Sequence, residues 1–154
     1  MKIKSATFFE CKVRYEKTME DGLQKKVTET YVVDALSFTE AESSIIEEMK
    51  PYVLSNNIND IEVTAIKIAP YKEVIFADTD STADKFYKVR CDFISIDEKN
   101  GKEKKTAVYY LVQASSVEGA RKRIDEAMGG TMIDYAIVSV VETNIMDVFE
   151  HETI

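Results

Sequence analysis

The sequence is poor in the residues from which most active sites and small cross-linked folds are built. Its 154 residues include one His, two Cys, five Gly, two Pro and no Trp. His151, the single histidine, stands near the end of the sequence, where we expect it to fray rather than to act in catalysis. Without a second histidine, Ser-His-Asp and Cys-His arrangements are hard to build. Cys11 and Cys91 lie far apart in strand-like runs, which predicts buried thiols in a reducing cytoplasm rather than a disulfide.

Other absences concern membranes, cofactors and metals. No apolar run approaches the roughly 20 residues that span a bilayer, and the first residues lack the apolar core of a signal peptide, so we expect a cytoplasmic protein with no membrane partner. There is no Walker loop and no G-x-G-x-x-G motif. Asp78, Asp80 and Asp84 have calcium-loop spacing, but Ala83 and Val89 stand where that loop needs Gly and Glu. We therefore predict no cofactor and no metal.

The charge balance disfavours one class of partner. Asp and Glu number 28 against 20 Lys and Arg, which gives a formal net charge of -8. Affinity for nucleic acid usually comes from a basic surface, so an acidic chain is a poor candidate unless it carries a local basic patch. Apolar residues make up 45% of the chain, enough for a hydrophobic core.

An internal repeat is the strongest feature of the sequence. Residues 22–49 align with residues 101–128 at an offset of 79, and eleven of these 28 pairs are identical. Further along, an offset of 74 aligns residues 65–66 and 73–74 with residues 139–140 and 147–148. Self-similarity of this kind indicates a duplicated supersecondary unit. We predict a first repeat over 1–77, a polar linker over 78–84 and a second repeat over 85–154.

Each repeat has the pattern of a ββαβ unit, with a short run that can form a fourth strand. Polar and apolar residues alternate over 9–15 and 87–93, as in half-buried strands. Gly22 and Gly101 follow Asp and Asn, a pair typical of tight hairpin turns. Third strands are expected at about 61–68 and 135–141, each parallel to the second strand with the first strand between or nearby. Short final runs follow at 72–76 and 145–149.

One helix is expected in each repeat between the second and third strands. Ser37 and Glu40 have capping-box spacing, whereas in the second repeat either Ser115 with Glu118 or Ser116 alone can cap the helix. Apolar residues spaced four apart should face the core; they are Ala41, Ile45 and Met49, and Ala120, Ile124 and Met128. The predicted fold class is α+β, with each antiparallel or mixed sheet covered by one helix and the repeats related by a pseudo-twofold axis in one compact domain.

The duplicated cations are the first candidate binding site. By strand parity, Lys12, Lys26, Arg90 and Lys105 lie on the sheet face away from the helix, together with Tyr109. Cations beside an aromatic ring on a sheet can bind single-stranded nucleic acid, a nucleotide or another phosphate ligand. The alternative is that strands need a polar outer face and that Lys protects sheet edges from aggregation.

The second candidate is an interface. Residues 107–112 are apolar on both faces of their strand, as in central or interfacial strands. We expect Val32, Ala107, Tyr109 and Leu111 to lie at an interface, either between the repeats or with another molecule. The leading hypothesis is a non-enzymatic structural or protein-interaction component, a homo-oligomer or part of a complex. An enzyme that uses carboxylates alone is the third hypothesis.

Three segments carry a resemblance to a known family. They are residues 9–18 (FECKVRYEKT), 33–42 (VDALSFTEAE) and 142–147 (ETNIMD). With them the chain resembles domain of unknown function 4494, a family of short proteins from gut-type bacteria and their mobile elements. The resemblance covers nearly the whole chain. It implies a cytoplasmic protein of phage or mobile-element origin and brings no activity and no site residues with it.

Overall fold

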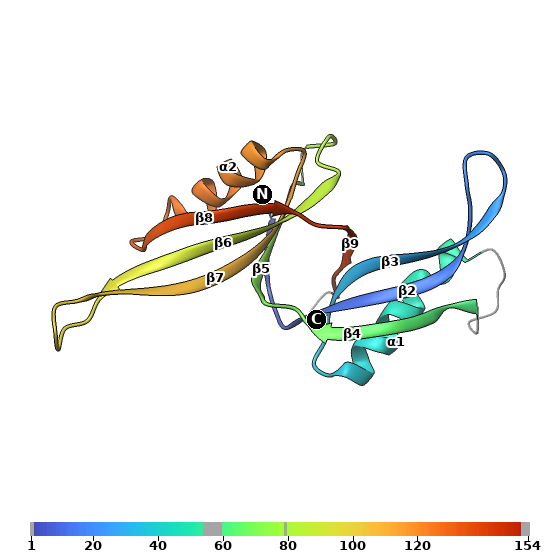
Figure 1. Ribbon diagram of the computed structural model, residues 1–154, viewed down its shortest axis with the longest axis horizontal. Helices are drawn as coiled ribbons and strands as arrows, with labels where there is room; N and C mark the ends of the chain where they lie inside the picture. Colours follow the sequence, from blue (N-terminus) through green and yellow to red (C-terminus); the bar gives the residue numbers. More distant parts are fainter. Residues whose placement is uncertain (1, 54–59, 79, 152–154) are drawn as a thin grey trace. The chain divides into compact units, whose positions relative to one another are not determined.

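The computed structural model describes residues 2–53, 60–78 and 80–151. The fold of this part is α+β, with two helices and two mixed sheets (Figure 1). The chain divides into two compact units: unit 1 comprises Met1–Ser5 and Pro70–Thr143, and unit 2 comprises Ala6–Ala69 and Asn144–Ile154. No helix in the described ranges is long and apolar enough to cross a membrane.

The elements follow one another in nearly the same order in the two halves of the chain. The first half contains β1 (Lys2–Ser5), β2 (Phe8–Thr18), β3 (Gln24–Asp34), α1 (Phe38–Met49), the 3-10 turn η1 (Lys50–Tyr52), β4 (Glu62–Ile68) and β5 (Tyr71–Phe76). The second half contains β6 (Lys85–Ile96), β7 (Glu103–Ala114), α2 (Val117–Met128), β8 (Asp134–Glu142) and β9 (Ile145–Phe149). Strand β1 was not predicted, because its four residues are too few for a clear alternation of polar and apolar residues.

Strand order agrees with the predicted arrangement of the first three strands. The sheet of unit 2 has the order β4-β2-β3-β9, and that of unit 1 has the order β1-β5-β7-β6-β8. In unit 2, β2 is antiparallel to both β3 and β4, so the third strand runs parallel to the second with the first between them, as predicted. The same holds for β6 between β7 and β8. The doubly apolar strand β7 is central in its sheet.

The fourth strand of each half pairs in the sheet of the other half. Strand β5 lies parallel to β7, and β9 lies parallel to β3 (Figure 1). Only residues 69–70 separate β4 from β5, and only residues 143–144 separate β8 from β9. Each compact unit therefore combines segments from both halves of the chain, because unit 1 includes β5 and unit 2 includes β9.

The two hairpins close with longer loops than a tight two-residue turn. Thr18 pairs with Gln24 and Ile96 pairs with Glu103, which leaves loops at 19–23 and 97–102. Gly22 and Gly101 have φ angles of 82° and 68°, and they are the residues with positive φ in the described chain. The glycines therefore serve the turns as predicted, but the residue before each keeps negative φ.

Both helices begin at a serine that caps them. The Ser37 Oγ accepts a hydrogen bond from the backbone N–H of Glu40, and the Glu40 carboxylate accepts one from the backbone N–H of Leu36. In the second half Ser116, not Ser115, is the cap, and its Oγ accepts from the backbone N–H of Gly119. All six predicted core residues of the helices are buried. Helix α1 contacts β2, β3 and β4, and α2 contacts β6, β7 and β8.

Candidate interaction surfaces

The predicted cationic residues fall into two separate groups. Lys12 and Lys26 lie on β2 and β3 of unit 2, whereas Arg90, Lys105 and Tyr109 lie on β6 and β7 of unit 1. We call the face of each sheet opposite its helix the outer face. Residues at alternate positions pack with the helix in each core, so all five predicted residues lie on an outer face.

The group in unit 1 brings an aromatic ring and cations together. Arg90 is directly opposite Tyr109 in the register between β6 and β7. The Lys88 Nζ lies 4.9 Å from the centroid of the Tyr109 ring, a cation–π contact. The Arg90 Nε lies 3.3 Å from Asp92 Oδ1, so one carboxylate sits among these cations. Lys88 was missed in the sequence, although it shares the parity of Arg90.

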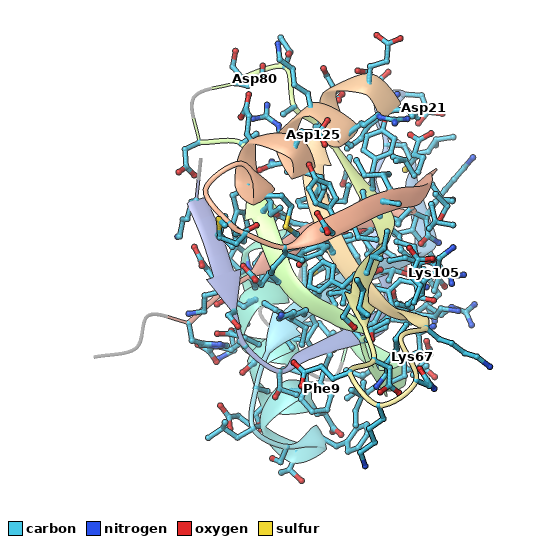
Figure 2. The ribbon with its side chains drawn as sticks, turned by 90° about the vertical axis from the view of Figure 1, so that its left-hand side faces the viewer. Phe9, Asp21, Lys67, Asp80, Lys105 and Asp125 are labelled. Carbon is cyan, nitrogen blue, oxygen red and sulfur yellow. The ribbon has the colours of Figure 1, made fainter. Side chains whose placement is uncertain are left out.

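Lys105 lies at the far end of the same face. It pairs with Ile94 in the register and is exposed at the surface (Figure 2). Ala107, between Lys105 and Tyr109 on this face, is also exposed, and Tyr109 is half-buried. We call this part of the outer face the open surface of unit 1; its residues are Lys88, Arg90, Ile94, Lys105, Ala107, Tyr109 and Val141.

The group in unit 2 has mixed charge. Lys12 and Lys26 are both exposed, but Lys26 stands opposite Glu16 in the register. Beside Lys12 on the outer face, Glu10 forms an ion pair of 3.0 Å with Lys67, which lies at the surface (Figure 2). Cations that alternate with carboxylates give a solvated strand face, which is the alternative reading of these lysines.

The four predicted interface residues divide by burial. Val32 and Leu111 are both 0% exposed in the single chain, so neither is accessible to a second molecule on the folded protein. Ala107 and Tyr109 remain accessible. Of these four residues, Ala107 and Tyr109 are therefore the two that another molecule can contact, and both belong to the open surface of unit 1.

Strand β8 is an edge strand with little protection against pairing. Its residues from Tyr135 to Val141 carry no charge, and Val138 and Val141 are 50% and 56% exposed. Strand β4 is the matching edge of unit 2, and it carries Glu62 and Lys67. Charged side chains on an edge strand oppose pairing with another chain. The pairing of β8 with β6 has one register shift, between Arg90 and Cys91. The central residues of β8 carry no charged side chains of the kind that protect β4.

A polar cluster in unit 2 was not foreseen from the sequence. Tyr15 and Tyr31 both donate hydrogen bonds to Oε1 of Glu29, at 3.0 Å for Tyr31, and the Lys17 Nζ lies 3.2 Å from Oε2. Burial, followed by the interaction with Glu29, holds the pKa of both phenols above its ordinary value. The residue equivalent to Glu29 in the second half is Val108, so the cluster belongs to one half only.

The expectation that His151 frays is wrong. Its backbone N–H donates to Asp34 Oδ1 at 2.8 Å, and its Nδ1 lies 2.6 Å from the same oxygen. Asp34 is itself buried at the end of β3. The hydrogen bond with Asp34 raises the pKa of His151, although partial burial opposes this. The contact ties the residues after β9 to β3, a long-range contact that no local pattern could reveal.

Both cysteines are free and buried, as expected for packing residues. Burial raises the pKa of Cys11 to about 12, with a smaller contribution from Glu10, and the pKa of Cys91 to about 11, with smaller contributions from Asp125 and Asp92. Because the thiolate is the nucleophile, burial and a raised pKa disfavour a nucleophilic role for both thiols.

The predicted polar linker is tied to unit 1; Thr79 within it lies outside the described residues. The Asp80 Oδ1 accepts from the backbone N–H and the hydroxyl of Thr82, and Oδ2 lies 3.1 Å from Nη2 of Arg123 on α2 (Figure 2). The Gln113 side chain accepts a hydrogen bond from the backbone N–H of Ala77, just before the linker, and donates one to the carbonyl of Ala83 within it. These contacts use the carboxylate of Asp80 in a turn. Among the described residues, no group of His, Cys, Asp and Glu is arranged to hold a metal ion.

The described residues of unit 2 form open depressions. One of about 490 Å³ lies at the β2–β3 hairpin loop, beside Lys17 and Asp21, and one of about 370 Å³ lies between the start of α1 and β4. Both are open to solvent, and neither is lined by a predicted site residue. Enclosed pockets with converging polar groups are typical of small-molecule sites, and these two depressions differ from that pattern.

Comparison with known proteins gives one relationship. A search of curated proteins and a search of solved structures each gave no match. The family model described as Domain of unknown function (DUF4494) matches residues 7–151, which include β2 to β9 and both helices. The chain therefore belongs to the DUF4494 family.

Proposed function

We propose that the protein is a non-enzymatic component that binds another polypeptide chain through the open surface of unit 1 and the edge of β8. One observation carries this proposal: β8 is an edge strand whose central residues are uncharged, and its residues Val138 and Val141 are 50% and 56% exposed. Exposed apolar residues beside an unprotected sheet edge are typical of strand addition by a partner. A second copy of this chain is the first partner to test.

The architecture supports this proposal. We propose that the halves are tandem copies of one ββαβ unit, each with its helix on one face of the sheet, and that a pseudo-twofold axis relates them. The matching element order, the serine caps and the buried helix positions favour duplication. The helix of unit 1 packs on the opposite face of the sheet, so it leaves the open surface accessible.

The most buried carboxylates are already engaged in ways that do not suggest catalysis. Asp34 accepts hydrogen bonds from His151, and Glu29 accepts from two tyrosines. A general acid of the carboxylate type needs a pKa raised by burial or by a second carboxylate close by. Burial raises the pKa of Asp147 on β9, whose Oδ1 accepts a hydrogen bond from the backbone N–H of Val148. The cation and phenol partners of Asp34 and Glu29 favour a structural role. The buried thiols of Cys11 and Cys91 are in keeping with a reducing, cytoplasmic location.

Light scattering over a concentration series tests the proposal. The wild-type chain should show a mass above that of the monomer at high micromolar concentration, and Val141→Lys should reduce this increase because it removes the association through the open surface and β8. Ile68→Lys is the matched control, because Ile68 is 60% exposed on β4, the edge strand of unit 2 that carries charged side chains. A wild-type chain that stays monomeric, or equal loss in both variants, would contradict the proposed surface.

A second candidate function is the binding of single-stranded nucleic acid or a nucleotide on the same open surface. The observation that favours it is the Lys88–Tyr109 contact, with Arg90 opposite Tyr109 and Lys105 farther along the face. Bases stack on aromatic rings while lysine and arginine contact phosphates. The formal net charge of -8 and the Arg90–Asp92 ion pair weaken it.

Titration of a fluorescent single strand at low salt decides between the candidates. If this surface binds, Tyr109→Ala and Lys105→Glu should each weaken affinity, whereas Lys26→Glu, on the mixed-charge face of unit 2, should change it little. Removal of one stacked ring should reduce binding by about 1–3 kcal/mol. Binding that is equally sensitive to Lys26→Glu and Lys105→Glu would show that the interaction is unspecific.

A further inference from the structure

The fourth place in each sheet has to be filled by a strand from another ββαβ unit. Strand β4 and strand β9 both run parallel to β3, at opposite edges of the sheet of unit 2. A strand that followed β4 into the place of β9 would have to cross about three strand spacings, or about 14 Å. It would also have to return along the whole sheet, which in parallel connections takes about a dozen residues or more.

The connectors are far too short for this return. Residues 69–70 join β4 to β5, and residues 143–144 join β8 to β9. Such a connector reaches about 10 Å when extended, because each residue spans at most about 3.6 Å. Within this chain, the fourth strand of each half instead joins the sheet of the other half. A sheet of this design is therefore a strand acceptor, and its donor is always a different copy of the unit.

The acceptor edge of unit 2 requires an apolar strand. Val148 is opposite Val32 in the register, and the Phe149 ring stacks on Tyr31 with centroids 5.2 Å apart. Val32 is fully buried and Val148 is 7% exposed with β9 in place. Beyond the strand, His151 bonds Asp34 at the end of β3. The acceptor thus selects its strand by apolar side chains and by one polar contact at its end.

We propose that β9 can be donated in trans, so that two copies of this chain exchange their C-terminal strands and form a dimer. Strand β9 has five residues, lies at the sheet edge and pairs with a single neighbour, β3. Strand β5, in contrast, lies between β1 and β7 and is held on both sides. The exchanged dimer keeps the pairing of β9 with β3 and changes the conformation of the connector, residues 143–144, where Thr143 donates hydrogen bonds to the carbonyl of Phe86. Exchange of identical elements is a low-cost route to dimers for this reason.

Mixed disulfide trapping on the full chain tests the proposal. A chain with Val32→Cys is mixed with a chain with Val148→Cys at high concentration, incubated and oxidised with oxidised glutathione. Paired residues of neighbouring strands are close enough for a disulfide. The mixture should give a covalent species of twice the chain mass that neither variant gives alone, since only β9 of one chain on β3 of the other joins these positions.

Two matched experiments make the result decisive. The double variant Val32→Cys/Val148→Cys, oxidised at low concentration, should close within one chain and shows that the pair can form a disulfide. A mixture of Val74→Cys with Leu111→Cys, the register pair of β5 and β7, should give little covalent dimer because β5 is held on both sides. No dimer from the first mixture, while the double variant closes, would overturn the proposal. Equal dimer from both mixtures would also overturn it, because it would indicate global unfolding.

Val141→Lys should leave the trapping unchanged, so this test is independent of the proposed binding surface.

Discussion

At the scale of single residues, the two halves differ most where polar groups are buried. Glu29 gathers Tyr15, Tyr31 and Lys17 in unit 2, whereas the equivalent position in the second half is Val108. The sequence showed this difference as a substitution in an aligned repeat, but the meeting of two phenols on one carboxylate depends on cross-strand register. Likewise, His151 and Asp34 are 117 positions apart, and their contact exists only because β9 pairs with β3.

Glu29→Gln should lower the free energy of unfolding by about 1–3 kcal/mol, because the two buried phenols lose a charged acceptor. Lys17→Met is the matched control: the Lys17 side chain is 42% exposed, so its ion pair with Glu29 should contribute less than about 1 kcal/mol. Urea unfolding of both variants measures the difference. Equal losses, or none for Glu29→Gln, would show that the cluster does not stabilise unit 2.

His151 should titrate with a pKa above the ordinary 6.5, because Asp34 favours its charged form. As the single histidine, it gives one unambiguous imidazole signal in a proton NMR titration, and Asp34→Asn should return its pKa toward the ordinary value. Since the folded-state pKa is raised, the stabilisation is fully present below pH 6.5 and is lost as the pH rises through the folded-state value. A pKa below 6.5 in the wild-type chain would contradict the contact.

At the scale of elements, local signals predicted the helices and the first three strands of each half well. The caps, the four-residue spacing of buried helix positions and the strand alternation all act within a few residues, so they are visible in a single sequence. The hairpin glycines were placed correctly, but loop length depends on where cross-strand pairing stops. The partner of the fourth strand was not predictable from local pattern, because β5 and β9 have the same apolar alternation whichever sheet they join.

The cap of α2 gives a direct test at this scale, since the sequence left Ser115 and Ser116 open. Ser116→Ala should lower the free energy of unfolding by about 1 kcal/mol, because the backbone N–H of Gly119 loses its acceptor. Ser115→Ala should be nearly neutral. Thermal unfolding of the two variants under the same conditions gives the comparison, and a larger effect at Ser115 would mean that the helix begins one residue earlier.

At the scale of the whole molecule, the predicted cations lie on two different sheets. Parity placed Lys12, Lys26, Arg90 and Lys105 correctly on outer faces, but it could not show that two different sheets carry them. Each group also includes a carboxylate, since Glu16 is opposite Lys26 and Asp92 is beside Arg90. Burial of Val32 and Leu111 likewise depends on the whole fold. Of the binding residues predicted from the sequence, those on the open surface of unit 1 are therefore the ones that we keep as candidates.

Each sheet is completed by the fourth strand of the other half, and one position tests this arrangement most directly. Ile75 of β5 pairs with Val112 of β7 in the exchanged arrangement, whereas without exchange its partner would be Val33, the residue equivalent to Val112 in its own half. The double variants Ile75→Cys/Val112→Cys and Ile75→Cys/Val33→Cys are oxidised at low concentration, and the intrachain disulfide is mapped by peptide mass analysis. The exchanged fold predicts a disulfide between positions 75 and 112 and none between 75 and 33; the reverse result would contradict it.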